Sequence, residues 1–207
     1  MVVLETQYFP CIAYFCSFFY QEQVFLEAHE NYGKQTYRNR CRIRTANKVE
    51  SLSVPVKSGN SRTAIRDLKI DHSEHWVKIH WRALQSAYGR APYFEFYADY
   101  IRDIFEKKHV YLFDLNIDSL TLCLKFLQMD VAPILTEKYE KQYNPPFKDL
   151  RTVISPKKEN STYDFYREVA YPQIFGKDFV ANLSVLDLLF CEGPNARTVI
   201  KNSVLPL

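Results

Sequence analysis

The N-terminal part of the chain restricts the possible folds most strongly, because two short apolar strands flank a longer apolar run. Val2–Leu4 and Val24–Leu26 consist of aliphatic and aromatic residues and predict strands. The apolar and aromatic residues 8–20 between them, with Pro10 near the start, predict a buried helix. A strand, a helix and a second strand within ~25 residues indicate a βαβ unit with a parallel pair of strands.

Polar side chains follow both predicted strands. Gln7 and Tyr8 come after the first strand, and His29 and Glu30 come after the second. Ligands of parallel sheets bind at the carboxyl ends of the strands. If the two strands are parallel, we therefore expect these residues to meet at one edge of the sheet and to form part of a site.

Residues 28–44 contain the densest group of chemically capable side chains. Its second half predicts a strand, in which side chains alternate between two faces. Cys41 and Ile43 then share one face, and the opposite face carries a row of guanidinium groups: Arg38, Arg40, Arg42 and Arg44. Such a row suits a phosphate or a carboxylate, because each planar fork donates two hydrogen bonds. The alternative is a basic face in solvent. The amides and the phenol within the stretch favour binding: Gln35, Tyr37 and Asn39.

The rest of the chain predicts one more hairpin strand, a loop and several helices. Residues 40–45 and 51–56 predict a hairpin, the polar residues 57–64 a loop, and residues 65–70 a short strand. Helices are predicted from Asp71, from Pro92, from Asn116 and from Ser184, and residues 137–160 predict a surface excursion. We therefore expect a single α/β domain over residues 1–207. It has a small mixed sheet with an N-terminal βαβ-like unit and a β-hairpin, flanked by helices.

Composition excludes several classes of protein. The net charge of +3 is small for a nucleic-acid-binding domain. Residues 8–20 are fewer than the ~20 needed to cross a bilayer, and they lack the features of a signal peptide. The five cysteines form no CxxC pair, so we predict no zinc site or other metal site. The cysteines are best interpreted as reduced, mostly buried thiols of a cytoplasmic protein. No glycine-rich phosphate loop is present, and the cofactor, if there is one, stays unknown.

Two further residues have a structural and a functional interpretation. His80 lies on the apolar stripe of a predicted helix, where a histidine is more often a hydrogen-bonded core residue than a catalyst. Asp187 has the spacing of a capping box with Ser184, and its alternative is a carboxylate near the arginines. No set of nucleophile, histidine and acid can be assigned, so His29 with Glu30 beside it is the first candidate for a general base.

Several short segments, spread in order along most of the chain, together form a recognisable pattern. They are Gln7-Tyr8-Phe9-Pro10, Tyr14-Phe15, His29-Glu30-Asn31-Tyr32, Lys34-Gln35-Thr36-Tyr37-Arg38-Asn39-Arg40, Leu52-Ser53-Val54-Pro55-Val56, His80-Trp81-Arg82, Gln85-Ser86-Ala87-Tyr88, Pro92-Tyr93-Phe94, Asn182-Leu183-Ser184 and Asp187-Leu188-Leu189-Phe190. In these segments the chain resembles the WbqC-like family of bacterial proteins. The resemblance implies a setting in the biosynthesis of bacterial surface polysaccharides, namely the O-antigen of lipopolysaccharide. It also implies transfer of a glycyl or similar acyl group to an amino sugar, and it supplies no catalytic residues.

The residues and the resemblance together predict a transferase whose acceptor is an amino sugar on a nucleotide or phosphate carrier. The candidate catalytic residues are His29, Glu30 and His80. The candidate substrate-binding residues are Gln7, Tyr8, Tyr14, Lys34, Gln35, Tyr37, Arg38, Asn39, Arg40 and Tyr88. The expected partner is a phosphate-bearing small molecule or a nucleotide sugar, with no nucleic acid and no membrane span. The alternative is a non-catalytic module of the same pathway that binds such a ligand. A nucleic-acid-binding protein is a third hypothesis, which the small net charge disfavours.

Overall fold

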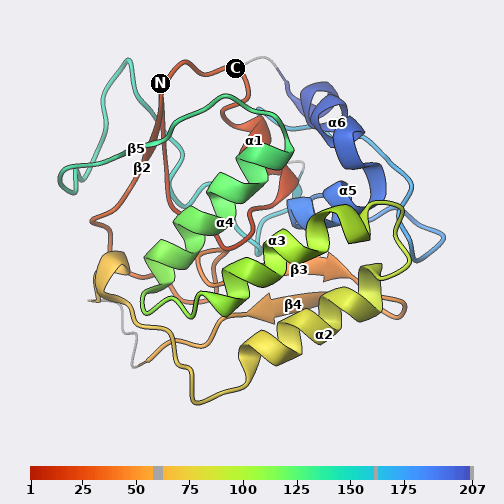
Figure 1. Cartoon of the computed structure of the whole chain (residues 1–207). Helices are drawn as coiled ribbons and strands as arrows, with labels where there is room; N and C mark the ends of the chain where they lie inside the picture. Colours follow the sequence, from red (N-terminus) through yellow and green to blue (C-terminus); the bar gives the residue numbers. More distant parts are fainter. Residues whose placement is uncertain (58–62, 161–162, 206–207) are drawn as a thin grey trace.

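A computed structural model of the chain describes residues 1–57, 63–160 and 163–205. The fold is α/β, as predicted, and its strands form two separate sheets (Figure 1). Four strands form a parallel sheet in the order β5-β2-β1-β6, and two form an antiparallel hairpin. The loop predicted over residues 57–64 falls mostly outside the described residues.

The predicted βαβ unit is confirmed, with a shorter helix than expected. β1 (Val2–Leu4) pairs in parallel with β2 (Val24–Leu26), and α1 (Ile12–Cys16) connects them. The helix ends at Cys16 and does not continue to residue 20, because the Ser17 hydroxyl donates to the Tyr14 carbonyl at 2.7 Å and the chain then turns. All five residues of α1 are buried.

The sheet gains two strands that the sequence did not predict. β5 (Ile134–Leu135) pairs with β2, and β6 (Lys148–Asp149) pairs with β1, both in parallel. β6 lies within residues 137–160, which were predicted to be a surface excursion, and β5 lies just before them. β5 and β6 are each only two residues long, so their extended conformation depends on pairing with the backbone of β2 and β1.

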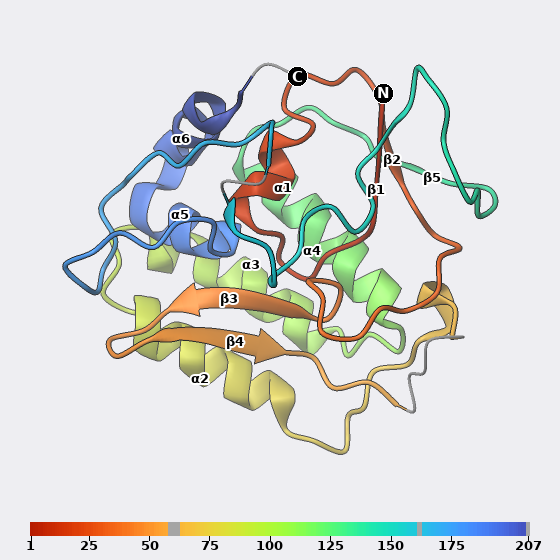
Figure 2. The same ribbon diagram turned by 180° about the vertical axis from the view of Figure 1, so that it is seen from behind.

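The hairpin has the predicted alternation. β3 (Arg40–Arg44) pairs with β4 (Val49–Ser53), and Figure 2 shows the pair lying against α2 (Trp76–Tyr88) and α3 (Phe94–Glu106). Cys41 and Ile43 are buried, and the arginines of β3 on the opposite face are half-buried. Arg38 lies before the first residue of the strand.

The middle of the chain forms a layer of three helices on one side of the hairpin (Figure 1). They are α2 (Trp76–Tyr88), α3 (Phe94–Glu106) and α4 (Leu112–Phe126), and the C-terminal part adds α5 (Val185–Glu192) and α6 (Ala196–Ser203). In place of the predicted strand over residues 65–70, the chain forms a 3-10 helix, η1 (Ile65–Asp67). Among the described residues, no helix has both the length and the apolarity that a bilayer span requires.

Of the four predicted helix starts, those at Asp71 and Asn116 differ from the structure, the one at Ser184 agrees with it, and α3 begins two residues after Pro92. α2 begins five residues after Asp71, because this carboxylate accepts bonds from the amide and hydroxyl of Ser73 and forms a turn of its own. Asn116 does not cap α4 but lies inside it. Ser184 caps α5 as predicted, since its hydroxyl accepts a bond from the Leu186 amide at 3.3 Å.

Candidate functional site

Two carboxylates occupy matched positions at the carboxyl edge of the parallel sheet. Glu5 directly follows β1, Glu27 directly follows β2, and the register pairs Leu4 with Leu26. The Glu27 amide donates to the Leu4 carbonyl at 2.8 Å. Glu5 is 1% exposed and Glu27 is fully buried. Because ligands of parallel sheets bind at this edge, the two carboxylates form the base of the candidate site.

Glu27 joins the segments that follow β2, β5 and β6. One of its oxygens accepts bonds from the Thr136 hydroxyl at 2.9 Å and from the His29 amide at 2.8 Å. The other accepts a bond from Arg151 at 2.8 Å, and Arg151 also binds Asp149 at 2.6 Å. An unpaired carboxylate is costly in the interior, and Arg151 compensates Glu27 there. This network fixes the backbone of His29.

Gln7 and Tyr14, both predicted to bind substrate, lie around Glu5 and are buried. The Gln7 amide donates to the Glu5 carboxylate at 3.1 Å, and the Thr152 amide donates to its other oxygen at 2.7 Å. The Tyr14 hydroxyl donates to the Glu5 carbonyl at 2.9 Å. The side chains of Gln7 and Tyr14 therefore hold Glu5 in place at the base of the site.

Glu30 faces Arg38 and forms a buried pair with it, separate from the side chain of His29. Arg38 donates two hydrogen bonds to the carboxylate, from Nε at 2.7 Å and from Nη2 at 2.6 Å. Burial raises the pKa of Glu30, and the bonds from Arg38 lower it in part. The predicted pairing of His29 with Glu30 is thus replaced by an ion pair, and Arg38 does not extend the arginine row of β3.

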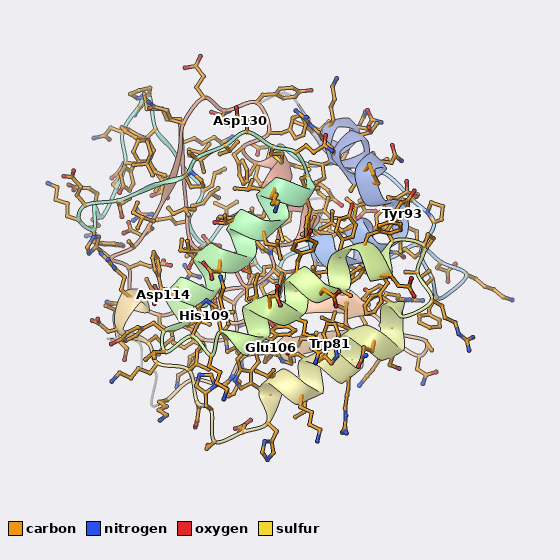
Figure 3. All side chains as sticks on the ribbon, viewed as in Figure 1. Trp81, Tyr93, Glu106, His109, Asp114 and Asp130 are labelled. Carbon is orange, nitrogen blue, oxygen red and sulfur yellow. The ribbon has the colours of Figure 1, made fainter. Side chains whose placement is uncertain are left out.

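His29 lines a cavity of about 550 Å³ beside this network. The walls come from the end of β2, from η1 and from the start of α4, where Figure 3 labels Asp114. The lining residues are Ala28, His29, Ala64, Arg66, Asp67, Tyr111, Phe113 and Asp114. His29 is half-buried, whereas Arg66, Asp67 and Asp114 are exposed.

The polar groups of this cavity suit a ligand with a cationic and an anionic part. The carboxylates of Asp67 and Asp114 attract a positive group, and the guanidinium of Arg66 attracts a negative one. Arg66 also lies over the Phe113 ring, with 5.8 Å between its Cζ and the ring centroid. Histidine is the side chain that most often transfers protons in enzymes. Among the described residues, no group of three or more acidic, histidine or cysteine side chains is arranged to hold a metal ion.

His80 and Tyr8 form a buried pair that does not line the His29 cavity. The Tyr8 hydroxyl lies 2.9 Å from Nδ1 of His80, and the Ser53 carbonyl lies 3.2 Å from Nε2. Because a carbonyl only accepts, Nε2 carries the hydrogen and Tyr8 donates to Nδ1. Burial lowers the pKa of His80 to about 4 and raises that of Tyr8. This geometry agrees with the interpretation of His80 as a core residue.

Tyr88 belongs to a third buried network, centred on Asp187. Its hydroxyl donates to Asp187 at 2.7 Å and accepts a bond from the Arg44 amide at 3.1 Å. The Tyr171 hydroxyl donates to the other carboxylate oxygen at 2.6 Å. Burial raises the pKa of Asp187, and the bonds from both tyrosines and the charge of Arg44 lower it in part. Asp187 is therefore a buried structural residue, and it also lies close to Arg44 of the arginine row. Both interpretations given for it from the sequence, structural residue and carboxylate near the arginines, thus apply.

The remaining predicted substrate-binding residues lie around the hairpin. Tyr37 is buried, and the Asn39 amide donates to the Val54 carbonyl at 2.9 Å. Lys34 and Gln35 are exposed, and Gln35 has a left-handed backbone with φ of 58°. Arg40 is half-buried, and its Nε has no hydrogen-bond partner among the described residues. These side chains and the cavity residues do not gather around one opening.

The sequence prediction missed the charged residues that hold and line the site. A signal for Glu5 and Glu27 was present, because each follows three apolar residues of a predicted strand. Arg151 gave no such signal, since β6 before it has the polar sequence Lys-Asp. Arg66 and Asp67 were assigned to a strand, and Asp114 was placed before the predicted helix start.

One of the comparisons with known proteins identifies a family. The profile of the WbqC-like protein family matches residues 6–163 and 155–199. The chain is also 28% identical over 223 residues to "Uncharacterized protein Rv1507c" of Mycobacterium tuberculosis (strain ATCC 25618 / H37Rv), with 95% of each chain covered. No solved structure matches. Since the family profile extends over most of the sequence, the chain belongs to the WbqC-like protein family.

Proposed function

We propose that this protein is a cytoplasmic transferase of bacterial surface-polysaccharide biosynthesis. It attaches a glycyl or other acyl group to an amino sugar carried on a nucleotide or phosphate. The reaction class comes from the resemblance to the family. The observation that carries the choice of site is the cavity at the carboxyl edge of the sheet, in which His29 lies with two carboxylates and one guanidinium.

The polar groups of the cavity support an amine as the acceptor. Asp67 and Asp114 attract the ammonium form of an amino sugar, and Arg66 binds the phosphate of its carrier. His29 is the one predicted catalytic residue that lines this cavity, because Glu30 is paired with Arg38 and His80 with Tyr8. The bond from the His29 amide to Glu27 fixes its backbone at the sheet edge.

In the proposed step, His29 takes a proton from the ammonium group of the acceptor. The free amine nitrogen then attacks the carbonyl carbon of an activated acyl donor, such as a thioester or an ester. The new C–N bond forms, the bond from the carbonyl carbon to the donor sulfur or oxygen breaks, and the leaving group departs with that electron pair. The second proton of the attacking nitrogen goes to the leaving group, which completes the amide.

The test is a transfer assay with acyl and aminoacyl thioesters or esters as donors and UDP-linked amino sugars as acceptors, with the amide product detected by mass spectrometry. Removing a general base lowers the rate by roughly 10²–10⁴. We expect a loss of this size in the turnover number of His29→Gln. His109→Gln is the matched control, since His109 binds Asp118 outside the cavity, and it should keep the wild-type rate. An unchanged turnover number for His29→Gln would remove its role as the base.

The alternative is a non-catalytic module that binds the phosphate-bearing ligand or nucleotide sugar of the same pathway. It is supported by the buried carboxylates at the sheet edge, all of which are bound by other protein groups: Glu5, Glu27 and Glu30. Binding of a UDP-linked amino sugar that Arg66→Ala abolishes, without product from any donor in the panel, would favour this alternative over the transferase.

A further inference from the structure

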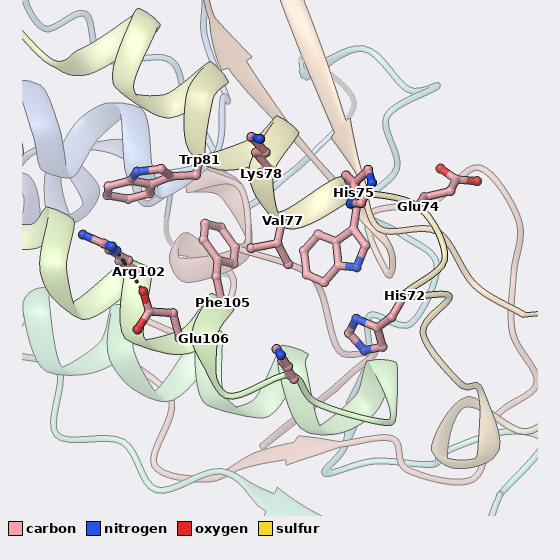
Figure 4. A pocket seen from close by; sticks show the side chains of 11 residues that line it. His72, Glu74, His75, Val77, Lys78, Trp81, Arg102, Phe105 and Glu106 are labelled. Atoms are coloured by element: carbon pink, nitrogen blue, oxygen red, sulfur yellow. Dashed lines mark hydrogen bonds and ion pairs between the residues drawn. The ribbon is translucent and has the colours of Figure 1, made fainter.

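A second cavity, of about 670 Å³, lies between α2 and α3 and shares no lining residue with the His29 cavity. We call it the α2–α3 groove; its apolar part consists of Trp76, Val77, Trp81 and Phe105. Figure 4 shows Trp81 and Arg102 at one end, His72 and His75 at the other, and Val77 and Phe105 between them. Trp76 and Phe105 are buried, with 6.0 Å between their ring centroids, and Trp81 is half-buried.

The rim of the groove has more basic than acidic side chains available to a ligand. Lys78 and Lys108 are exposed, and within residues 1–57, 63–160 and 163–205 neither forms an ion pair. Arg102 binds Glu106 at 2.9 Å, so these two charges compensate each other. Glu74 is the other acidic residue of the rim. The two lysines therefore leave a cationic rim around an aromatic floor.

The floor also contains a hydrogen-bond donor without an acceptor. The indole N–H of Trp76 is buried and has no partner among the described residues, and Trp76 is 4% exposed. An indole nitrogen only donates, and an unsatisfied buried donor is unfavourable. A ligand atom that accepts a hydrogen bond would relieve this cost once the Trp76 side chain turns its N–H into the groove.

We propose that the α2–α3 groove binds a nucleoside phosphate. The base stacks on the half-buried ring of Trp81, because every base has a π-face that an aromatic side chain can contact. The phosphates bind Lys78 and Lys108, and Glu74 accepts bonds from the ribose hydroxyls. The cavity volume lies within the range of roughly 300–1,000 Å³ that small-molecule sites occupy.

Intrinsic fluorescence tests this proposal directly, because both tryptophans of the chain line the groove. The probes are ADP, UDP, adenosine and inorganic pyrophosphate, with excitation at the red edge of indole absorption, where nucleotides do not absorb. We expect saturable quenching by the two nucleotides and much weaker effects of adenosine and pyrophosphate, each of which lacks one half of the recognised ligand. Absence of saturable quenching by either nucleotide would overturn the proposal. So would equal quenching by adenosine, because the phosphates would then not contribute.

Variants separate groove binding from unspecific attraction. Losing one charge-assisted contact to phosphate weakens binding about tenfold, so the double variant Lys78→Ala/Lys108→Ala should bind ADP at least about tenfold more weakly. Arg82→Ala is the matched control, since Arg82 is exposed on α2 and does not line the groove. Equal affinity of the double variant and the control would refute the groove as the site. His29→Gln should quench like the wild type, so this test stays independent of the transferase proposal.

Discussion

The buried imidazole of His80 should make the stability of the protein depend on pH. Its pKa is lowered from 6.5 to about 4, because burial disfavours the charged form. At pH values between these two, the unfolded chain binds more protons than the folded protein, so acid favours unfolding. Relative to pH 8, this linkage lowers the free energy of unfolding by about 2 kcal/mol at pH 5 and about 3 kcal/mol at pH 4. The contribution is fully present above the unfolded pKa and is lost as the pH falls through this window.

The geometry explains why the imidazole resists protonation. The single N–H of the neutral ring donates to the Ser53 carbonyl, and Nδ1 accepts the hydrogen of the Tyr8 hydroxyl. A proton on Nδ1 would place two donors opposite each other, and the Tyr8 hydroxyl would have to turn away inside a packed core. His80→Gln is the informative change, because its amide can replace both bonds and carries no titratable group.

The assay is urea unfolding of wild type and His80→Gln at a series of pH values from 8 to 5. The wild type should lose about 2 kcal/mol more than the variant over this range, since every other titrating group is common to both. His75→Gln, an exposed histidine at the start of the same helix, is the control and should follow the wild type. Parallel pH curves for wild type and His80→Gln would refute the reasoning, because the imidazole would then not differ in pKa between the folded and unfolded states.

Two further substitutions test how the core tolerates charge and backbone strain. Arg38→Met leaves Glu30 buried without its partner and should lower the free energy of unfolding, measured by urea titration, by roughly 3–5 kcal/mol. Adding Glu30→Gln should restore part of this loss, and an equal loss in the double variant would contradict the prediction. Gly193→Ala should lower the free energy of unfolding by roughly 1–3 kcal/mol, because φ is 53° and the new Cβ would clash with the Tyr93 ring. Gly33→Ala, whose nearest neighbour would be at 3.4 Å, is its control, and equal melting temperatures would argue against strain at Gly193.

Local patterns predicted those parts of the fold that depend on residues near each other in the sequence. The parallel pair β1 and β2, the alternation of Cys41 and Ile43 with the arginines, and the cap at Ser184 were all readable in this way. β5 and β6 were not, because two-residue strands have no periodicity and acquire their conformation from the neighbouring backbone. The boundaries of α1 and α2 depended on hydrogen bonds of single side chains, which compete with the helix and which no periodicity reveals.

The residues that line the cavity together with His29 could not be predicted from the sequence. The sequence placed His29 after a strand, and the structure confirms that position. Arg66 and Asp67 reach the cavity because the Ile65 amide donates to the Glu30 carbonyl at 2.9 Å, which fixes η1 beside the end of β2. The start of α4 follows because the Leu112 amide donates to the Leu68 carbonyl at 2.9 Å. Each bond joins segments more than 30 residues apart and involves only backbone atoms, which every sequence supplies equally. The side chains that line the cavity therefore determine what it can bind. Its assembly depends on hydrogen bonds between backbone atoms, which the local sequence pattern does not reveal.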